Sequence, residues 1–156
     1  LFACYTGTAY ADAVSITREN LFQDDEGSLW LKYRRKKTDY LGRVKLLPEA
    51  LALIGKYRDD TRITLFPPQD YHTLRANMKS LRLMAGLSQD LVYHMGRHSF
   101  ASLVTLEKGV PIETISKMLG HSNIKTTQIY ARVTPKRLFE DMDRFVEATR
   151  DLKLIL

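Results

Sequence analysis

The sequence of 156 residues has a single cysteine, Cys4, and no long apolar segment. One thiol cannot form a disulfide within the chain or supply a cysteine-rich zinc site. A run of about 18 apolar residues, the length that crosses a bilayer, is absent, and no signal-peptide pattern stands at the start. These absences fit a protein of the reducing cytoplasm that has no membrane-spanning helix.

Metal-binding patterns are absent as well. His94, His98 and His121 do not form the pattern of a zinc peptidase, and no cluster of carboxylates stands where two magnesium ions would be held. We therefore expect a site that works without a metal and without any other cofactor.

Composition indicates one compact domain over residues 1–156, because a chain of this length with 44% hydrophobic residues can bury a proper core. The net charge is +6, and the lysines and arginines are spread along the chain, as expected for a folded surface that faces a polyanion. On charge alone, an ordinary basic protein is the alternative. The opening residues 1–5 look like the end of a buried helix, so we expect a further segment upstream.

Alternating apolar and polar residues predict a small antiparallel sheet near the front of the chain. Residues 24–27 are a turn signal, Leu29–Arg34 alternates as a half-buried strand does, and Arg43–Leu47 is the returning strand. Residues 36–39 would form the hairpin turn between these strands.

Helical patterns dominate the rest of the sequence. Prolines suit first helical positions and glycines suit helix ends, which sets several boundaries. The predicted helices are a short one over residues 9–14, one opening at Pro48, one over 70–85 with an apolar stripe of Leu74, Met78, Leu81 and Met84, one over 97–108, one over 112–119, one capped by Ser122 that carries Tyr130, and a last one opened by Thr134 and Pro135. We expect a mainly helical α+β fold, with the small sheet packed on a helical core.

The residues most informative about chemistry lie in the second half of the chain. They are His94-Met-Gly-Arg97-His98, then Leu119-Gly-His121, then Tyr130, which stands nine positions after His121. Arginine presents a planar fork of donors that matches two phosphate oxygens, histidine donates hydrogen bonds or protons, and a tyrosine hydroxyl can attack phosphorus. The set suits phosphoryl transfer. Taken singly, each residue has an ordinary alternative: a salt bridge for Arg97, a helix cap for His121 and a core aromatic for Tyr130.

These residues resemble the catalytic domain of the tyrosine recombinase (phage integrase) family, whose second motif reads His-x-x-Arg-His and is followed by Leu-Gly-His and the nucleophilic tyrosine. The resemblance extends upstream through Thr6-Gly7, Asp12 and Lys37, so it covers nearly the whole chain. The wording of residues 117–133 is especially similar to integrases of bacterial conjugative and mobilisable transposons.

The resemblance implies roles for the main residues. Tyr130 is the expected nucleophile, Arg97 the phosphate clamp, and His121 a hydrogen-bond donor to the scissile phosphate. His94 matches a second histidine on the phosphate side and is a candidate base for Tyr130. Lys37, at the tip of the predicted hairpin, is the candidate acid for the departing 5′ oxygen.

Other residues receive supporting roles. Lys36 is a rival to Lys37, with plain phosphate contact as the alternative for both. Asp12 matches an acid that orients a neighbour, and His98 is expected to be a buttressing core histidine. The cations expected to contact DNA are Arg34, Arg35, Lys36 and Lys125.

One departure from the family pattern concerns the first motif. The family reads Thr-Gly-x-Arg, whereas this chain has Thr6-Gly7-Thr8-Ala9, so the second arginine of the phosphate clamp is missing. Either another cation substitutes for it or cleavage is slow or lost. As substitutes we rank residues upstream of Leu1 above Arg34 and Arg35.

The resemblance implies a site-specific DNA recombinase that cuts and rejoins strands through a 3′-phosphotyrosyl intermediate, without metal or ATP, during integration or excision of a mobile element. Its partners would be double-stranded attachment sites, an upstream DNA-binding domain, an accessory DNA-bending protein and further copies in a tetrameric synapse at the bacterial nucleoid. The alternatives are a type IB topoisomerase and a DNA-binding module with weakened catalysis.

The last predicted helix carries one more hypothesis. Its apolar stripe either packs on the core of its own chain or docks into a neighbouring protomer during synapsis, and we favour docking. The stripe consists of Leu138, Met142, Phe145, Thr149 and Leu152, extended by residues 154–156.

Overall fold

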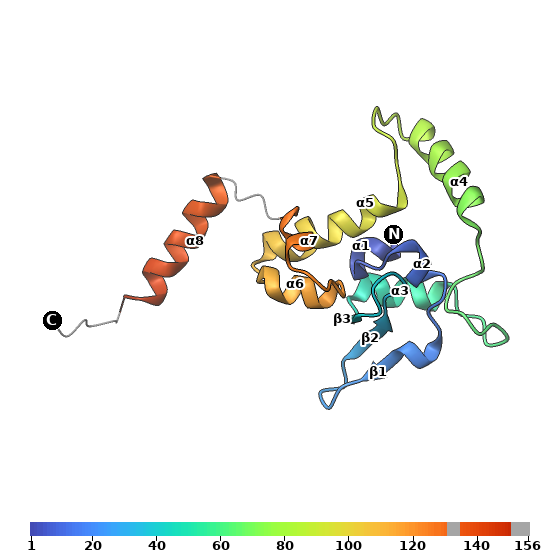
Figure 1. Cartoon of the computed structure of the whole chain (residues 1–156), viewed down its shortest axis with the longest axis horizontal. Helices are drawn as coiled ribbons and strands as arrows, with labels where there is room; N and C mark the ends of the chain where they lie inside the picture. The colour runs from blue at the N-terminus through green and yellow to red at the C-terminus, as the bar shows by residue number, and fades with distance from the viewer. Residues whose placement is uncertain (131–134, 151–156) are drawn as a thin grey trace.

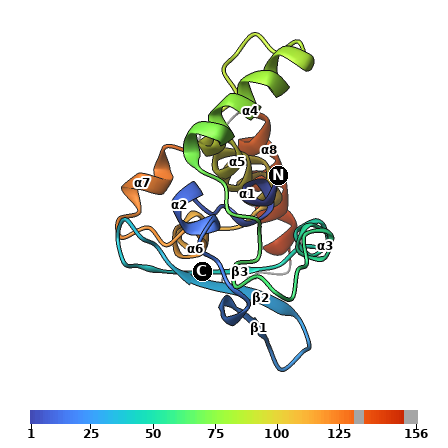
Figure 2. The same cartoon turned by 90° about the vertical axis from the view of Figure 1, so that its right-hand side faces the viewer.

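The computed structural model describes residues 1–130 and 135–150. A small antiparallel sheet lies at one side of the molecule, and most of the helices gather on the other (Figure 1, Figure 2). The sheet has the order β1 (Leu21–Gln23), β2 (Leu29–Arg34), β3 (Leu41–Lys45). The helices are α1 (Phe2–Thr6), α2 (Tyr10–Ala13), α3 (Pro48–Lys56), α4 (Tyr71–Met84), α5 (Tyr93–Ser99), α6 (Ile112–Met118), α7 (Lys125–Gln128) and α8 (Pro135–Ala148). These elements confirm the predicted α+β class. Among the described residues, none of the helices has the length and apolar character of a membrane span.

The alternation in β2 explains how the sheet packs. Leu31 and Tyr33 point to one face and are buried, whereas Lys32 and Arg34 are exposed. β2 lies in the centre, where Leu31 pairs with Leu21 of β1 on one side and with Val44 of β3 on the other. The prediction of this strand was correct at both ends.

Two features of the sheet differ from the prediction. The returning strand covers Leu41–Lys45 instead of Arg43–Leu47, because its pairing with β2 already begins at Leu41, opposite Arg34. Strand β1 was not predicted. Its three residues are too few to show a period, and only the pairing with β2 makes them a strand.

The starts of α3 and α4 follow the sequence signals. Pro48 occupies the first turn of α3, and Asp70 caps α4 by accepting a hydrogen bond from the Thr73 backbone N–H at 2.8 Å. The apolar stripe predicted for α4 does not enter a core, since no residue of this helix is buried and Met84 is 85% exposed.

The helix expected over residues 97–108 begins one turn earlier, at Tyr93. After Ser99 it widens into a π-helical turn over Phe100–Thr105, which passes into a 3-10 turn that ends at Gly109, where φ is 88°. The Thr105 hydroxyl donates to the carbonyls of Phe100 and Ala101, so it shares acceptors with the helix backbone. The earlier start places His94 in the first turn of α5.

The segment before Tyr130 was predicted wrongly. Ser122 does not cap a helix; instead Asn123 accepts a hydrogen bond from the backbone N–H of Lys125, and α7 spans only Lys125–Gln128. Tyr130 therefore lies two residues beyond a short helix and not within it. Its backbone N–H donates to the Thr127 carbonyl at 3.0 Å, which keeps the turn closed.

Two buried apolar clusters hold the elements together. The first lies between the sheet, α1 and α3, and consists of Phe2, Ile16, Leu31, Tyr33, Leu46, Ala50 and Leu65. The second joins β3 to the helices that carry the sequence motifs, and consists of Val44, Phe100, Ala101, Ile115, Leu119 and Tyr130. Because Leu119 and Tyr130 belong to this second core, the packing energy of the fold also fixes the motif residues in place.

The last helix, α8, lies at the edge of the molecule (Figure 1). Its apolar stripe is exposed, with Leu138 at 53%, Met142 at 50% and Phe145 at 60%. The stripe therefore does not form part of either core. Thr134, Leu152 and residues 154–156, which the prediction included, lie outside the described residues.

Gly7 tests how closely the N-terminal segment packs against Phe100 and Leu119. A Cβ at this position would stand 2.5 Å from Leu119 Cδ2 and 2.6 Å from Phe100 Cδ1, and the backbone has φ +68°. Overpacking costs about 1–3 kcal/mol and the left-handed conformation roughly 1–2 kcal/mol more. We expect Gly7→Ala to lower the free energy of unfolding in urea by about 2 kcal/mol or more.

Gly55 provides the matched control. It lies in α3, and a methyl group added there would meet no neighbouring atom within 4 Å. Gly55→Ala should raise stability by about 0.5–1 kcal/mol. Equal effects of the two substitutions would contradict this packing account.

Candidate active site

The sequence motifs meet in one pocket of about 240 Å³. Its walls come from the β2–β3 turn, from α5, from the loop between α6 and α7, and from the segment that ends at Tyr130. The lining residues are Arg35, Lys37, Thr38, His94, Arg97, His121, Ser122, Thr126, Ile129 and Tyr130. All five residues predicted to be catalytic thus lie around a single cavity, although they are distant in sequence.

Arg97 is the most buried of these residues, with 1% of its surface exposed. Its guanidinium donates to the carbonyl oxygens of Gly7 and Leu119 and lies 2.7 Å from His121 Nε2. Burial lowers the pKa of Arg97, but a guanidinium stays charged in proteins. No ion pair joins it to a carboxylate of the described residues, so its charge is available to an anion that enters the pocket.

Gly120 places His121 at the pocket. It adopts φ +62°, and a Cβ there would stand 2.9 Å from Arg35 Cγ. A glycine is therefore required both by the turn and by the close approach of the Arg35 side chain. The chain reverses after Leu119, and the imidazole of His121 comes to lie between Arg97 and Thr127.

His121 is held by both ring nitrogens. Nε2 lies 2.7 Å from Arg97 Nη2, and Nδ1 lies 2.8 Å from the Thr127 hydroxyl. Burial, and then the positive charges of Arg97 and Arg35, lower the pKa of His121 to about 4. The imidazole is therefore neutral at pH 7.

The Tyr130 ring packs against one histidine, His98, which in turn packs against His94. The Tyr130 ring meets His98 edge to face with centroids 4.7 Å apart, and His98 meets His94 in the same way at 4.7 Å. His98 was expected in the core but is exposed, and its ring packs against the rings of Tyr130 and His94. Burial and the neighbouring positive charges lower the pKa of His94, so this histidine is also neutral at pH 7.

The turn between β2 and β3 is anchored by Asp12. The buried carboxylate of Asp12 forms an ion pair with Arg35 at 3.3 Å and accepts a hydrogen bond from the Lys36 backbone N–H at 2.9 Å. Thr38 donates from the same turn to the Gly120 carbonyl at 3.4 Å. Asp12 thus orients the turn that presents Lys37 to the pocket.

The remaining predicted DNA contacts lie outside this pocket. Arg34 has a side chain that is 67% exposed and pairs with Asp39. Lys36 and Lys125 are exposed as well. Of the four surface cations named from the sequence, only Arg35 lines the cavity.

One residue of this site was missed by the sequence analysis. Thr127 is fully buried and holds His121, but a threonine in a short polar helix carries no distinctive signal. Its position six residues after His121 and three before Tyr130 becomes meaningful only once the turn is known.

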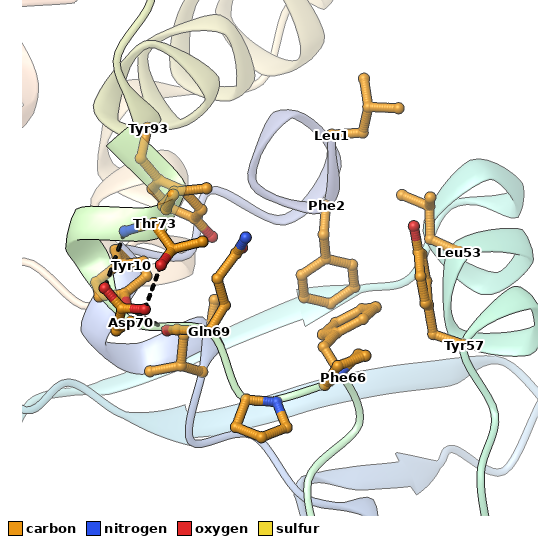
Figure 3. Close-up of a pocket in the computed structure, with 15 residues that line it drawn as sticks. Leu1, Phe2, Tyr10, Leu53, Tyr57, Phe66, Gln69, Asp70, Thr73 and Tyr93 are labelled. Carbon is orange, nitrogen blue, oxygen red and sulfur yellow. Dashed lines mark hydrogen bonds between the residues drawn. The ribbon is translucent and has the colours of Figure 1, made fainter. Parts of the chain in front are cut away.

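A second and larger pocket, of about 630 Å³, shares no lining residue with the first (Figure 3). Aromatic and proline side chains dominate its wall, among them Phe2, Tyr57 and Phe66, and none of the predicted catalytic residues lines it. No lysine or arginine lines it either. No group of three histidine, cysteine, aspartate or glutamate side chains that could hold a metal occurs in the part of the chain that the structure describes.

Comparison with known proteins places this site in a family. The chain is 29% identical to the integrase of Escherichia phage P2 over 133 residues, which cover 85% of the chain and 36% of that integrase. The crystal structure of XerA recombinase superposes with a TM-score of 0.69 at 26% identity, over 91% of this chain and 54% of that one. The Tn1549 transposon integrase in complex with transposon right end DNA shares the fold, with a TM-score of 0.64 at 16% identity over 92% of this chain and 56% of that one.

The chain therefore spans about a third to a half of the length of these relatives. The sequence model of the phage integrase family matches residues 1–137, which include every motif residue of the pocket. The chain belongs to the phage integrase family of tyrosine recombinases.

Proposed function

We propose that this chain is the catalytic part of a site-specific DNA recombinase, which cuts and rejoins strands through a 3′-phosphotyrosyl intermediate. The main support is the buried cation of Arg97, which has no carboxylate partner among the described residues and shares a pocket with Tyr130. A buried unpaired charge is costly, and it is worth keeping where an anion binds. The Tn1549 integrase, which shares the fold, was solved in complex with transposon right end DNA.

The proposed reaction exchanges one phosphoester for another. The Tyr130 hydroxyl oxygen forms a bond to phosphorus, and the bond from phosphorus to the 5′ oxygen breaks. The phenol proton passes to His94, whose neutral imidazole can accept it, and Lys37 gives a proton to the departing 5′ oxygen. A 5′ hydroxyl of the partner duplex then reverses the step. The number of phosphoester bonds is unchanged, so the reaction needs no ATP.

Arg97 acts on the phosphate itself. Charge grows on the non-bridging oxygens as phosphorus becomes five-coordinate, and a donor fixed in place stabilises that state more than the ground state. The carbonyls of Gly7 and Leu119 fix the guanidinium before DNA arrives.

Arg35 is the proposed substitute for the arginine missing at Ala9. It lines the pocket, whereas Arg34 pairs with Asp39 at the surface. Its charge lowers the pKa values of both Arg97 and His121, which supports an action on the same site. We favour Arg35 over the residues upstream of Leu1 that the sequence ranked first, because a second cation is already present. Its presence also favours an active enzyme over a DNA-binding module that has lost catalysis.

The partners follow from this proposal. Arg34, Lys36 and Lys125 would contact the DNA backbone around the pocket. An upstream domain would also bind the attachment sites, which would lie in the bacterial nucleoid. The exposed stripe of α8 would dock into a neighbouring protomer of the synapse, since its own core does not cover it. An accessory DNA-bending protein would assist assembly.

The adduct between protein and DNA tests the reaction. Full-length protein incubated with a suicide duplex, nicked near the junction of the element ends, should give a covalent complex on a denaturing gel. Tyr130→Phe should abolish it and change DNA affinity little, since one hydroxyl contributes little to a largely electrostatic interface. An adduct formed by Tyr130→Phe at the wild-type yield would contradict the proposal.

Chelation tests the proposal that no metal takes part. Adduct formation should proceed at the same rate in excess EDTA, because no group of three histidine, cysteine, aspartate or glutamate side chains among the described residues could hold a metal. The control is a metal-dependent nuclease in the same buffer, which must stop. Loss of the adduct with EDTA and its return with magnesium would exclude the mechanism.

Substitutions in the β2–β3 turn test the role of Arg35. Arg35→Ala should slow adduct formation by about 10²- to 10³-fold, the loss that follows removal of a well-aimed oxyanion donor. Arg58→Ala is the control, because Arg58 is an exposed arginine that pairs with Asp60 and does not line this pocket, and it should change the rate about threefold or less. Ala9→Arg should leave the wild-type rate unchanged.

Because Arg35 also pairs with Asp12, the double variant Arg35→Ala with Asp12→Asn separates catalysis from folding. It removes the buried carboxylate charge that Arg35→Ala leaves unpaired. Recovery of thermal stability without recovery of the rate is the expected result. Recovery of both would mean that Arg35 only supports the turn.

A further inference from the structure

The Nε2 atom of His121 acts as a hydrogen-bond acceptor in this structure and not as a donor. A guanidinium has only donor groups, so the 2.7 Å contact between Arg97 Nη2 and His121 Nε2 requires Nε2 to carry no proton. In a neutral imidazole the proton then sits on Nδ1, which donates to the Thr127 hydroxyl at 2.8 Å. The two hydrogen bonds together fix one tautomer.

This tautomer does not suit a bound phosphate. Phosphate oxygens accept hydrogen bonds, so a bare Nε2 would repel them, whereas a protonated Nε2 would donate to them. In the absence of DNA, Arg97 and His121 satisfy each other. An incoming phosphate competes for the Arg97 donor and leaves His121 with its proton on the wrong nitrogen.

We propose that Thr127 is a positioning residue that reverses its hydrogen bond to His121 when the DNA phosphate enters, so that His121 changes from an acceptor toward Arg97 into a donor toward phosphate. This inference rests on the function proposed above. The imidazole loses its Nδ1 proton to solvent and takes one from solvent at Nε2, so no net proton is bound. The Thr127 hydroxyl, which had accepted from Nδ1–H, now donates to bare Nδ1.

Thr127 is suited to this exchange by its chemistry and by its place. A hydroxyl is both a donor and an acceptor and can rotate between the two roles in a buried site. Thr127 is 0% exposed, so its hydroxyl is kept beside Nδ1 and is not drawn away by bulk solvent. Its backbone carbonyl accepts from the Tyr130 N–H at 3.0 Å, which ties the nucleophile to the same residue.

The charges around His121 favour a change of tautomer over uptake of a proton. Arg97 and His94 face it from α5, and Arg35 faces it from the β2–β3 turn. These groups and burial keep the ring neutral, and Arg97 and Arg35 remain beside it when DNA binds. A neutral ring can donate through Nε2 only if Nδ1 finds a donor, and Thr127 is the group in contact with Nδ1.

The tautomer can be read directly by ¹⁵N NMR of histidine-labelled full-length protein that carries Tyr130→Phe, which binds DNA without cutting it. We expect the free protein to show the proton of His121 on Nδ1 and the complex with an element-end duplex to show it on Nε2. A free protein with the proton on Nε2, or a complex in which it stays on Nδ1, would overturn the inference.

Adduct formation gives an independent test. Thr127→Val keeps the shape but leaves Nδ1 without a hydroxyl partner, and should slow the reaction about 10- to 100-fold, the cost of one unsatisfied buried group. Thr127→Ser should stay within about threefold of wild type, because it keeps the hydroxyl. Thr105→Val is the matched control, since Thr105 is also buried but bonds only to helix carbonyls, and it should leave the rate unchanged.

Two outcomes would separate this inference from the proposed function. Equal rates for Thr127→Val and wild type would overturn the role of Thr127 and leave the recombinase proposal intact. A tautomer change on DNA binding, with no adduct from the wild type, would support the role of Thr127 and contradict the recombinase proposal.

Discussion

The site depends on one interaction, the burial of the Arg97 guanidinium against the backbone carbonyls of Gly7 and Leu119. These carbonyls come from opposite parts of the chain, so the cation ties the first helix to the turn before His121. Neutral acceptors orient the charge without cancelling it. Burying the cation has a desolvation cost, but its backbone partners hold the guanidinium in position before phosphate binds.

Packing around this cation explains why small residues surround it. Gly7 allows the Leu119 and Phe100 side chains to pack against its backbone, and Gly120 allows the Arg35 side chain to pack against its own. The Asp12 carboxylate then fixes the β2–β3 turn, from which Lys37 also reaches the same cavity. In the Leu-Gly-His motif the glycine therefore matters as much as the histidine, because only a residue without a side chain leaves room for Arg35.

The sequence predicted the fold class, strand β2 and the starts of α3 and α4, because these follow from local alternation, proline and capping. The five residues predicted to be catalytic line one pocket, and the prediction rested on the resemblance of their motifs to a known family. The predictions from sequence were wrong or incomplete where contacts with residues distant in sequence determine the structure. The pairing of β1, the start of α5 at Tyr93, the exposed position of His98 and the contact between Thr127 and His121 depend on tertiary neighbours. The roles of the pocket residues stay predictions.

The central claim is that the Tyr130 oxygen forms the covalent link to DNA. The most direct measurement is mass spectrometry of the protein–DNA adduct after digestion with nuclease and trypsin. We predict a nucleotide 3′-phosphate attached to the peptide of residues 126–132, in which Tyr130 is the single tyrosine. A nucleotide on a peptide that contains any other tyrosine, such as Tyr93 beside His94, would contradict the account.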